Sequence, residues 1–283
     1  MRQKPLRLLV AGMLTVVLGV TGTVQPAQAA PSSLKPTATD PYTTLIEVGA
    51  GLLKSVLSGG GVSEADLARA VAQITAQIDQ AKTEIINHID AIGSAEVQAC
   101  VRTNTIEFAS INSMPRTVLQ LWAQSATACA SKATAYLNAL VSPAAVDHVG
   151  WLVGEIYTIV IAARTKANLT EGLDLVRQDE ISAFTSVRTK LTPPETTSFG
   201  PVPRCVTWWQ YADPNGFIDE LYYSCYAYNG DFAQRMQAFW AGTGVPAEPP
   251  IDYEGVRAEA SKRTSRPVAI SALVSLRNVH PGR

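Results

Sequence analysis

Three histidines, His88, His148 and His280, are the side chains that could act as a base near neutral pH. Catalysis would also need a nucleophile or a second acid beside the base. The sequence contains no GxSxG elbow, no HExxH motif, no phosphate-binding glycine loop and no GxGxxG fingerprint. Glu84 lies one helical turn before His88, which favours a surface pair, and His148 follows Asp147 at a helix start that we expect to be solvated. We therefore predict no catalytic residues and lean against an enzyme.

The segment DPNGFID, residues 213–219, is similar to part of an EF-hand calcium loop. With Asp213 at loop position 3, however, Tyr211 and Tyr222 would stand at positions 1 and 12, which require carboxylates in that loop. A hairpin turn explains the same residues without a metal. No two cysteines have the CxxC spacing of zinc sites. The sequence predicts no metal and no cofactor.

The chain has four cysteines, which allow three disulfide pairings: Cys100, Cys129, Cys205 and Cys225. The midpoint between the first two falls on Met114-Pro115, where one helix can stop and another start. The midpoint between the last two falls on Asn215-Gly216, a strong turn signal. Segments that fold back at these points bring each pair within the roughly 7 Å between Cα atoms that a disulfide needs. We predict structural disulfides Cys100–Cys129 and Cys205–Cys225.

Aromatic residues, which prefer strands, gather between the last two cysteines. A hairpin turning near Asn215 would set Cys205 opposite Cys225, Thr207 opposite Tyr223 and Trp209 opposite Leu221. Rings then lie on both faces of the hairpin, either inside a small core or on an exposed platform for sugars and other flat apolar surfaces. The candidate binding residues of that platform are Trp208, Trp209, Tyr211, Tyr222 and Tyr223.

Two further elements should support this hairpin, because an isolated hairpin is marginal in water. VAISALVSL, residues 268–276, alternates apolar residues with period two and predicts a partner strand. Residues 231–241 predict a short helix over one face.

The earlier part of the chain predicts a series of helices with short connections, typical of an antiparallel bundle. We expect helices over 43–57, from 63 to about 92, and over 94–112, 116–141, 144–166 and 169–191. In the helix that begins at residue 63, apolar residues have the spacing of a coiled-coil seam up to Ile85. The next seam position would be His88, but the apolar stripe continues at Ile89 and Ile92 instead. This favours a bundle wall over the alternatives, a homodimeric coiled coil and a lipid-binding helix.

Residues 149–163, VGWLVGEIYTIVIAA, are apolar on all sides and carry one charge, Glu155. Such a segment is typical of a central bundle helix. The alternative is a concealed membrane-inserting segment, as in helical pore-forming proteins, although the run is short for a membrane span.

The N-terminus predicts export. Arg2, Lys4 and Arg7 precede an apolar run over residues 8–20, and Ala27-Gln28-Ala29 has the pattern that signal peptidases cleave. The run is shorter than the roughly 20 residues of a membrane anchor. Cleavage near Ala29 would change the net charge from −1 to −1 − 3 = −4. A mildly acidic chain argues against nucleic acid and against anionic lipid as partners.

These observations predict a mainly α-helical, α+β protein in four parts. The parts are a signal peptide (1–29), a flexible leader (30–42), an α-helical bundle (43–192) and a small, disulfide-linked, aromatic-rich β/α module (196–283). The function we expect is non-catalytic binding of an extracellular ligand or protein. A membrane-active protein that releases residues 149–163 is the alternative, with membrane binding not favoured, and a secreted hydrolase is third.

Overall fold

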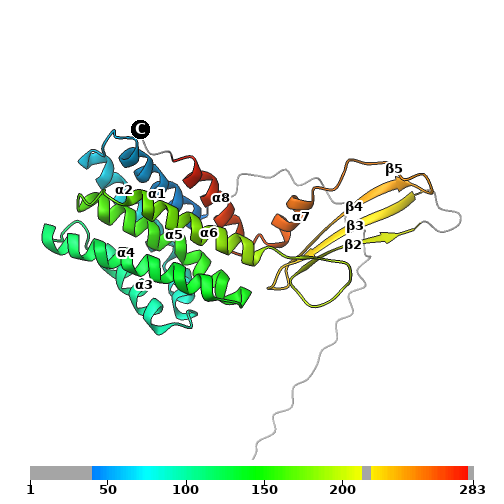
Figure 1. Cartoon of the computed structure of the whole chain (residues 1–283), viewed down its shortest axis with the longest axis horizontal. Coiled ribbons are helices and arrows are strands. Elements are labelled where there is room, and N and C mark those ends of the chain that lie inside the picture. The colour runs from blue at the N-terminus through cyan, green and yellow to red at the C-terminus, as the bar shows by residue number, and fades with distance from the viewer. Residues whose placement is uncertain (1–39, 212–217, 280–283) are drawn as a thin grey trace, which may run out of the picture. The chain divides into compact units, whose positions relative to one another are not determined.

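The computed structural model describes residues 40–211 and 218–279, which form helices followed by a sheet and two further helices (Figure 1). The predicted signal peptide, most of the predicted leader, the turn at Asn215-Gly216, most of the calcium-like segment and His280 lie outside these residues. The helices are α1 (Pro41–Leu57), α2 (Glu64–Asp90), α3 (Ala95–Phe108), α4 (Arg116–Ala139), α5 (Pro143–Lys166), α6 (Leu173–Leu191), α7 (Tyr253–Ala260) and α8 (Arg266–Arg277). The α+β class with a helical majority is confirmed.

The starts of the first three helices are set by polar side chains that cap free backbone N–H groups. The Asp40 carboxylate accepts from the amide of Tyr42, and Ser94 caps α3 in the same way. At α2 the amide of Asp66 donates to Ser63 Oγ at 3.1 Å, and the Ser63 hydroxyl donates to the Asp66 carboxylate at 2.6 Å. The buried stripe of α2 continues from Ile85 to Ile89, as the spacing predicts for an unsupercoiled bundle helix.

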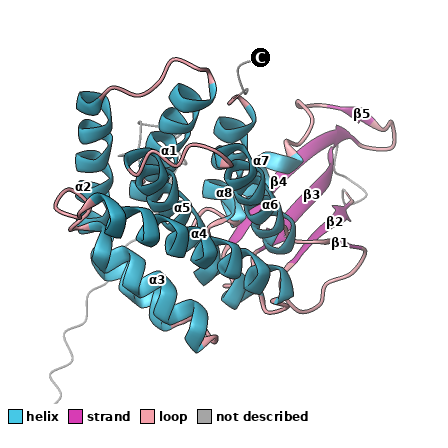
Figure 2. Ribbon diagram, turned by 60° about the vertical axis from the view of Figure 1, so that its left-hand side comes forward, coloured by secondary structure: helices cyan, strands magenta, loops and turns pink. Residues whose placement is uncertain are grey.

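Helix α5 is the central helix of the bundle (Figure 2). It contacts α1, α2, α3, α4, α6 and α8, and 16 of its 24 residues are buried. This confirms the central position expected for residues 149–163. Among the described residues, α5 is also the helix whose length and mean hydropathy of 1.3 would suit a membrane span. A buried core helix of a bundle has the same length and hydropathy.

Both predicted disulfides are present. Cys100–Cys129 joins α3 to α4 with a Cα–Cα distance of 5.7 Å, and Cys205–Cys225 joins two strands at 4.1 Å. Disulfides persist in oxidising compartments, so the pairings are consistent with an extracellular location.

In the described part of the chain the sheet has five strands in the order β1-β2-β3-β4-β5: β1 (Glu195–Thr196), β2 (Arg204–Gln210), β3 (Ile218–Tyr226), β4 (Phe232–Trp240) and β5 (Val245–Pro246). β1 pairs with β2 in parallel, and the other pairs are antiparallel. The predicted register of the hairpin is confirmed, since Thr207 lies opposite Tyr223 and Trp209 opposite Leu221. Helix α7 packs on β3 and β4.

The helix expected over residues 231–241 is wrong, because these residues form β4. Ala, Gln, Arg and Met in this segment are good helix formers, but helix propensity is a weak preference that tertiary contacts override. Gly230, with φ of 84°, allows a tight turn directly after β3, so the chain returns along the free edge of β3. Pairing of the whole β3 edge outweighs the local propensity.

The partner strand expected over 268–276 is also wrong, because these residues lie in α8. Its apolar run fits a helix as well as a strand: Val268, Ala269, Ala272, Leu273 and Leu276 are buried at helical spacing, while Val274 is 60% exposed. Helix α8 packs on α6 and α1 within the bundle core, away from the sheet strands. Domain boundaries at 192 and 196 stay a prediction.

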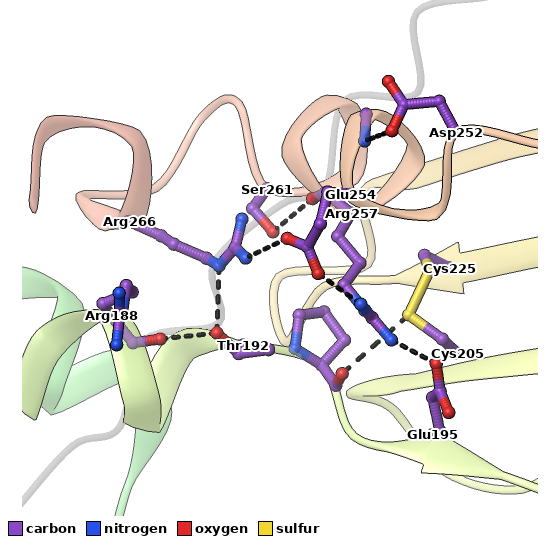
Figure 3. A network of polar contacts seen from close by, with 12 residues as sticks. Arg188, Thr192, Glu195, Cys205, Cys225, Asp252, Glu254, Arg257, Ser261 and Arg266 are labelled. Atoms are coloured by element: carbon purple, nitrogen blue, oxygen red, sulfur yellow. Dashed lines mark hydrogen bonds and ion pairs between the residues drawn. A yellow bond between two sulfur atoms is a disulfide. The ribbon is translucent and has the colours of Figure 1, made fainter. Parts of the chain in front are cut away.

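A network of arginine side chains connects the end of α6, the start of α8, α7 and β1 (Figure 3). Arg266, 3% exposed, donates to Thr192 Oγ1 at 3.1 Å and to the Glu254 carboxylate at 3.4 Å. Arg257 forms ion pairs with Glu254 and with Glu195 of β1. These contacts hold α7 on the sheet face that carries the second disulfide, and so decide which aromatic residues stay exposed.

Candidate functional site

One face of the sheet is a small core beneath α7. Successive strand residues point to opposite faces, so Tyr223, Leu221 and both cysteines of the second disulfide share this face. Tyr223 is 1% exposed, and its ring meets that of Tyr253 of α7 edge to face at 4.6 Å between centroids. The structure therefore places this candidate binding residue inside the core.

Trp208 and Tyr222 lie on the opposite face as a cross-strand pair. Their rings are stacked, with centroids 4.2 Å apart and planes within 7°. Trp208 Nε1 also donates to Ser224 Oγ at 3.4 Å, and the Tyr222 hydroxyl donates to Glu220 at 2.6 Å. Each ring covers a face of the other, so this pair offers a ligand less flat surface than two separate rings would.

Trp209 and Tyr211 form the most accessible aromatic pair among the five candidates. They follow one another by two residues, so both point to the α7 side of the sheet at the end of β2. Their centroids are 6.1 Å apart with planes within 10°, and the Phe239 ring lies 5.1 Å from that of Trp209. Trp209 is 43% exposed and Tyr211 is 73% exposed. We call Trp209, Tyr211 and Phe239 the aromatic patch.

The same end of the sheet is also apolar on its other face. Ile218 pairs with Trp240, and Trp240 pairs with Val245. All three side chains are 42–52% exposed. Exposed apolar side chains that cluster in this way commonly mark contact sites.

Sequence reasoning missed a histidine pair at the junction of α2 and α5. His88 Nδ1 and His148 Nδ1 are 3.1 Å apart, and the Trp151 ring stacks on His88 at 5.8 Å between centroids. Burial, together with the charge of His148, lowers the pKa of His88 to about 4. The residues are 60 positions apart, so no local spacing could indicate the contact. The surface pair expected between Glu84 and His88 is absent from the hydrogen bonds and ion pairs of the described residues.

The solvated helix start expected at Asp147 is wrong. Asp147 is 6% exposed, and its carboxylate accepts from the Ser265 amide at 2.5 Å and from the Tyr228 hydroxyl at 2.6 Å. It therefore connects α5 to the start of α8 and to the β3–β4 turn. A carboxylate committed to two donors holds elements together and is poorly placed to act on a substrate.

Two buried carboxyl groups have raised pKa values. Burial raises the pKa of Glu155 to about 7, although a hydrogen bond from Thr105 at 2.7 Å opposes the shift. Burial alone raises the pKa of Glu180 to about 8. Among the described residues, neither group has a hydrogen bond or ion pair with a histidine, and they give no nucleophile–base pair.

Within residues 40–211 and 218–279, no group of three or more His, Cys, Asp or Glu side chains could hold a metal ion. No protein-family model matches this chain, and neither a curated protein nor a solved structure matches it.

Proposed function

We propose that this chain is an exported, non-catalytic binding protein that contacts its ligand through the aromatic patch. The observation that carries the proposal is the Trp209–Tyr211 pair, two nearly parallel rings with large exposed fractions. Rings placed in this way present flat apolar surface at little entropic cost, because each side chain has two rotatable bonds. Sugar rings and other flat, weakly charged groups fit such a surface.

Export is the second part of the proposal. The N-terminal run with its Ala27-Gln28-Ala29 motif supports cleavage near Ala29, and the two disulfides support an oxidising destination. N-terminal sequencing of the protein recovered from culture medium tests both points. Recovery only inside the cell, with residues 1–29 intact, would contradict export.

The binding test uses a panel of insoluble polysaccharides and soluble oligosaccharides as probes. We expect saturable binding to at least one probe, and at least a tenfold loss of affinity in Trp209→Ala and in Tyr211→Ala, because each substitution removes a stacking surface. Trp240→Ala is the matched control, since Trp240 is 51% exposed on the opposite face.

Far-ultraviolet circular dichroism should be the same for all three variants, because none of these side chains is in a core. Retained binding in Trp209→Ala and Tyr211→Ala would contradict the patch as the contact surface. An equal loss of affinity in Trp240→Ala would indicate that both faces at this end of the sheet form the contact surface.

A second candidate function, membrane activity, rests on α5, the one helix of the described residues that is long and apolar enough for a span. Release of α5 would require the bundle to open, since most of α5 is buried. Dye release from liposomes of neutral and anionic composition, measured from pH 4 to pH 8, tests this idea. Absence of leakage under all these conditions would exclude it.

A further inference from the structure

A groove lies between α2 and α3, which are consecutive in the chain. Its volume is about 450 Å³, within the range of small-molecule sites. On α2 the lining extends from Thr75 to Ile89, which corresponds to about 21 Å of helix at 1.5 Å per residue. This length suits an extended chain better than a compact ring system.

The lining of the groove is predominantly apolar. Its large apolar side chains are Ile78, Ile85, Ile86, Ile89, Ile106 and Phe108. Two of these, Ile86 on α2 and Ile106 on α3, are 41% and 64% exposed. Isoleucines that line one groove from two helices and stay in contact with water would be shielded by an apolar ligand.

Charged residues at the groove favour an anionic head group. Lys82, Arg102 and Asp79 line it. Arg102 pairs with Asp90, whereas Lys82 has no hydrogen bond or salt bridge with any described residue. An ammonium group beside an apolar groove complements a molecule with one carboxylate and a long alkyl chain.

We propose that the α2–α3 groove binds a long-chain fatty acid, with the alkyl chain against the isoleucines and the carboxylate beside Lys82. This site is lined by residues of the bundle and does not depend on the aromatic patch. Trp209→Ala should therefore leave fatty-acid binding unchanged, which separates a failure of this proposal from a failure of the proposed function.

The test is isothermal titration calorimetry with decanoate, undecanoate and dodecanoate below their micelle concentrations. We expect one molecule bound per chain and an affinity that rises about fourfold for each added methylene, the ratio set by burying one methylene. Lys82→Ala should weaken dodecanoate binding about two- to fivefold, as for an exposed ion pair. The same variant should leave the binding of dodecanol, which has no carboxylate, unchanged.

Ile106→Asp places a carboxylate in the groove and should weaken both ligands more than about tenfold. Its matched control is Leu121→Asp on α4, because Leu121 is 69% exposed and does not line the groove. Ile106 is also largely exposed, so both variants should keep the wild-type circular dichroism.

Four results would overturn the proposal. The first is no saturable binding of dodecanoate, and the second is equal binding by Ile106→Asp and wild type. The third is a concentration-dependent dimer that Ile106→Asp abolishes, which would identify a second copy of the chain as the occupant. If dodecanol binds as tightly as dodecanoate and Lys82→Ala changes neither affinity, the assignment of a fatty acid fails.

Discussion

The Nδ1 atoms of His88 and His148 lie 3.1 Å apart and join α2 to the central helix α5. One ring must donate and the other accept, so this contact needs at least one neutral imidazole. Trp151 covers His88 on one side, which removes water that would otherwise stabilise its charged form. Protonation of both rings would place two positive charges in contact.

This pair predicts a loss of stability in acid. The pKa of His88 in the fold, about 4, is below its ordinary value of 6.5, so the unfolded chain binds more protons between these pH values. The contribution of His88 to the free energy of unfolding is therefore complete above pH 6.5 and is lost as the pH falls toward 4. Urea unfolding at several pH values should show a shallower acid loss in His88→Gln.

The variant His148→Gln distinguishes the causes of that shift. Burial is the larger cause and the charge of His148 is the smaller. We therefore expect His148→Gln to keep most of the acid loss that His88 causes, and His88→Gln to remove that part of the loss. An acid loss that persists unchanged in His88→Gln would assign it to other groups.

The buried carboxyl group of Glu180 predicts a loss of stability as the pH rises, opposite to the effect of His88. Its pKa in the fold, about 8, is above the ordinary value of 4.5, so the folded state binds more protons between these values. Its contribution is complete below pH 4.5 and is lost as the pH rises toward 8. Glu180→Gln should unfold at higher urea concentration than wild type at pH 8, with a smaller difference at pH 5. An equal difference at both pH values would contradict this.

Two helical glycines predict substitutions with opposite effects. A Cβ atom at Gly154 of α5 would lie 2.7 Å from Ile46 Cγ1, whereas a Cβ atom at Gly51 of α1 meets nothing within 4 Å. Gly154→Ala should destabilise the protein by about 1–2 kcal/mol through overpacking. Gly51→Ala should stabilise it by about 0.5–1 kcal/mol through helix propensity. Thermal denaturation measures both, and destabilisation by both would contradict the close contact as the cause.

Two tyrosines at the sheet predict different losses of stability when each is replaced by alanine. Tyr223 is 1% exposed beneath α7, and Tyr211 is 73% exposed. Tyr223→Ala should cost about 3–5 kcal/mol, as for truncation of a large buried ring. Tyr211→Ala should change the free energy of unfolding by less than about 0.5 kcal/mol. Similar values for the two variants, measured by urea unfolding, would contradict the placement of these rings.

The elements most accurately predicted from sequence are those with local signals. Ser63 with Asp66 marks the start of α2, and the positions of Cys205 and Cys225 predict the register of β2 and β3. Local signals predicted the wrong kind of element in two segments. The run 268–276 fits both helix and strand periods, and residues 232–240 contain several good helix formers but complete a sheet.

In the candidate site, too, some features follow from local sequence signals and others do not. The sequence identified the aromatic residues and the face of each one, because strand residues alternate. It did not indicate that α7 would cover Tyr223, that Trp208 would stack on Tyr222, or that Trp209 would stay exposed. The first of these outcomes depends on contacts such as Arg257 with Glu195, which lie 62 positions apart.

By itself, the sequence determined the disulfide pairing, the central apolar helix and the α+β class, because turns, caps and apolar periodicity act between residues close in the chain. The tertiary structure alone decided which rings meet water, which carboxyl groups are buried, and that His88 meets His148. Burial depends on which elements pack together, and that choice is made by the free energy of the whole fold.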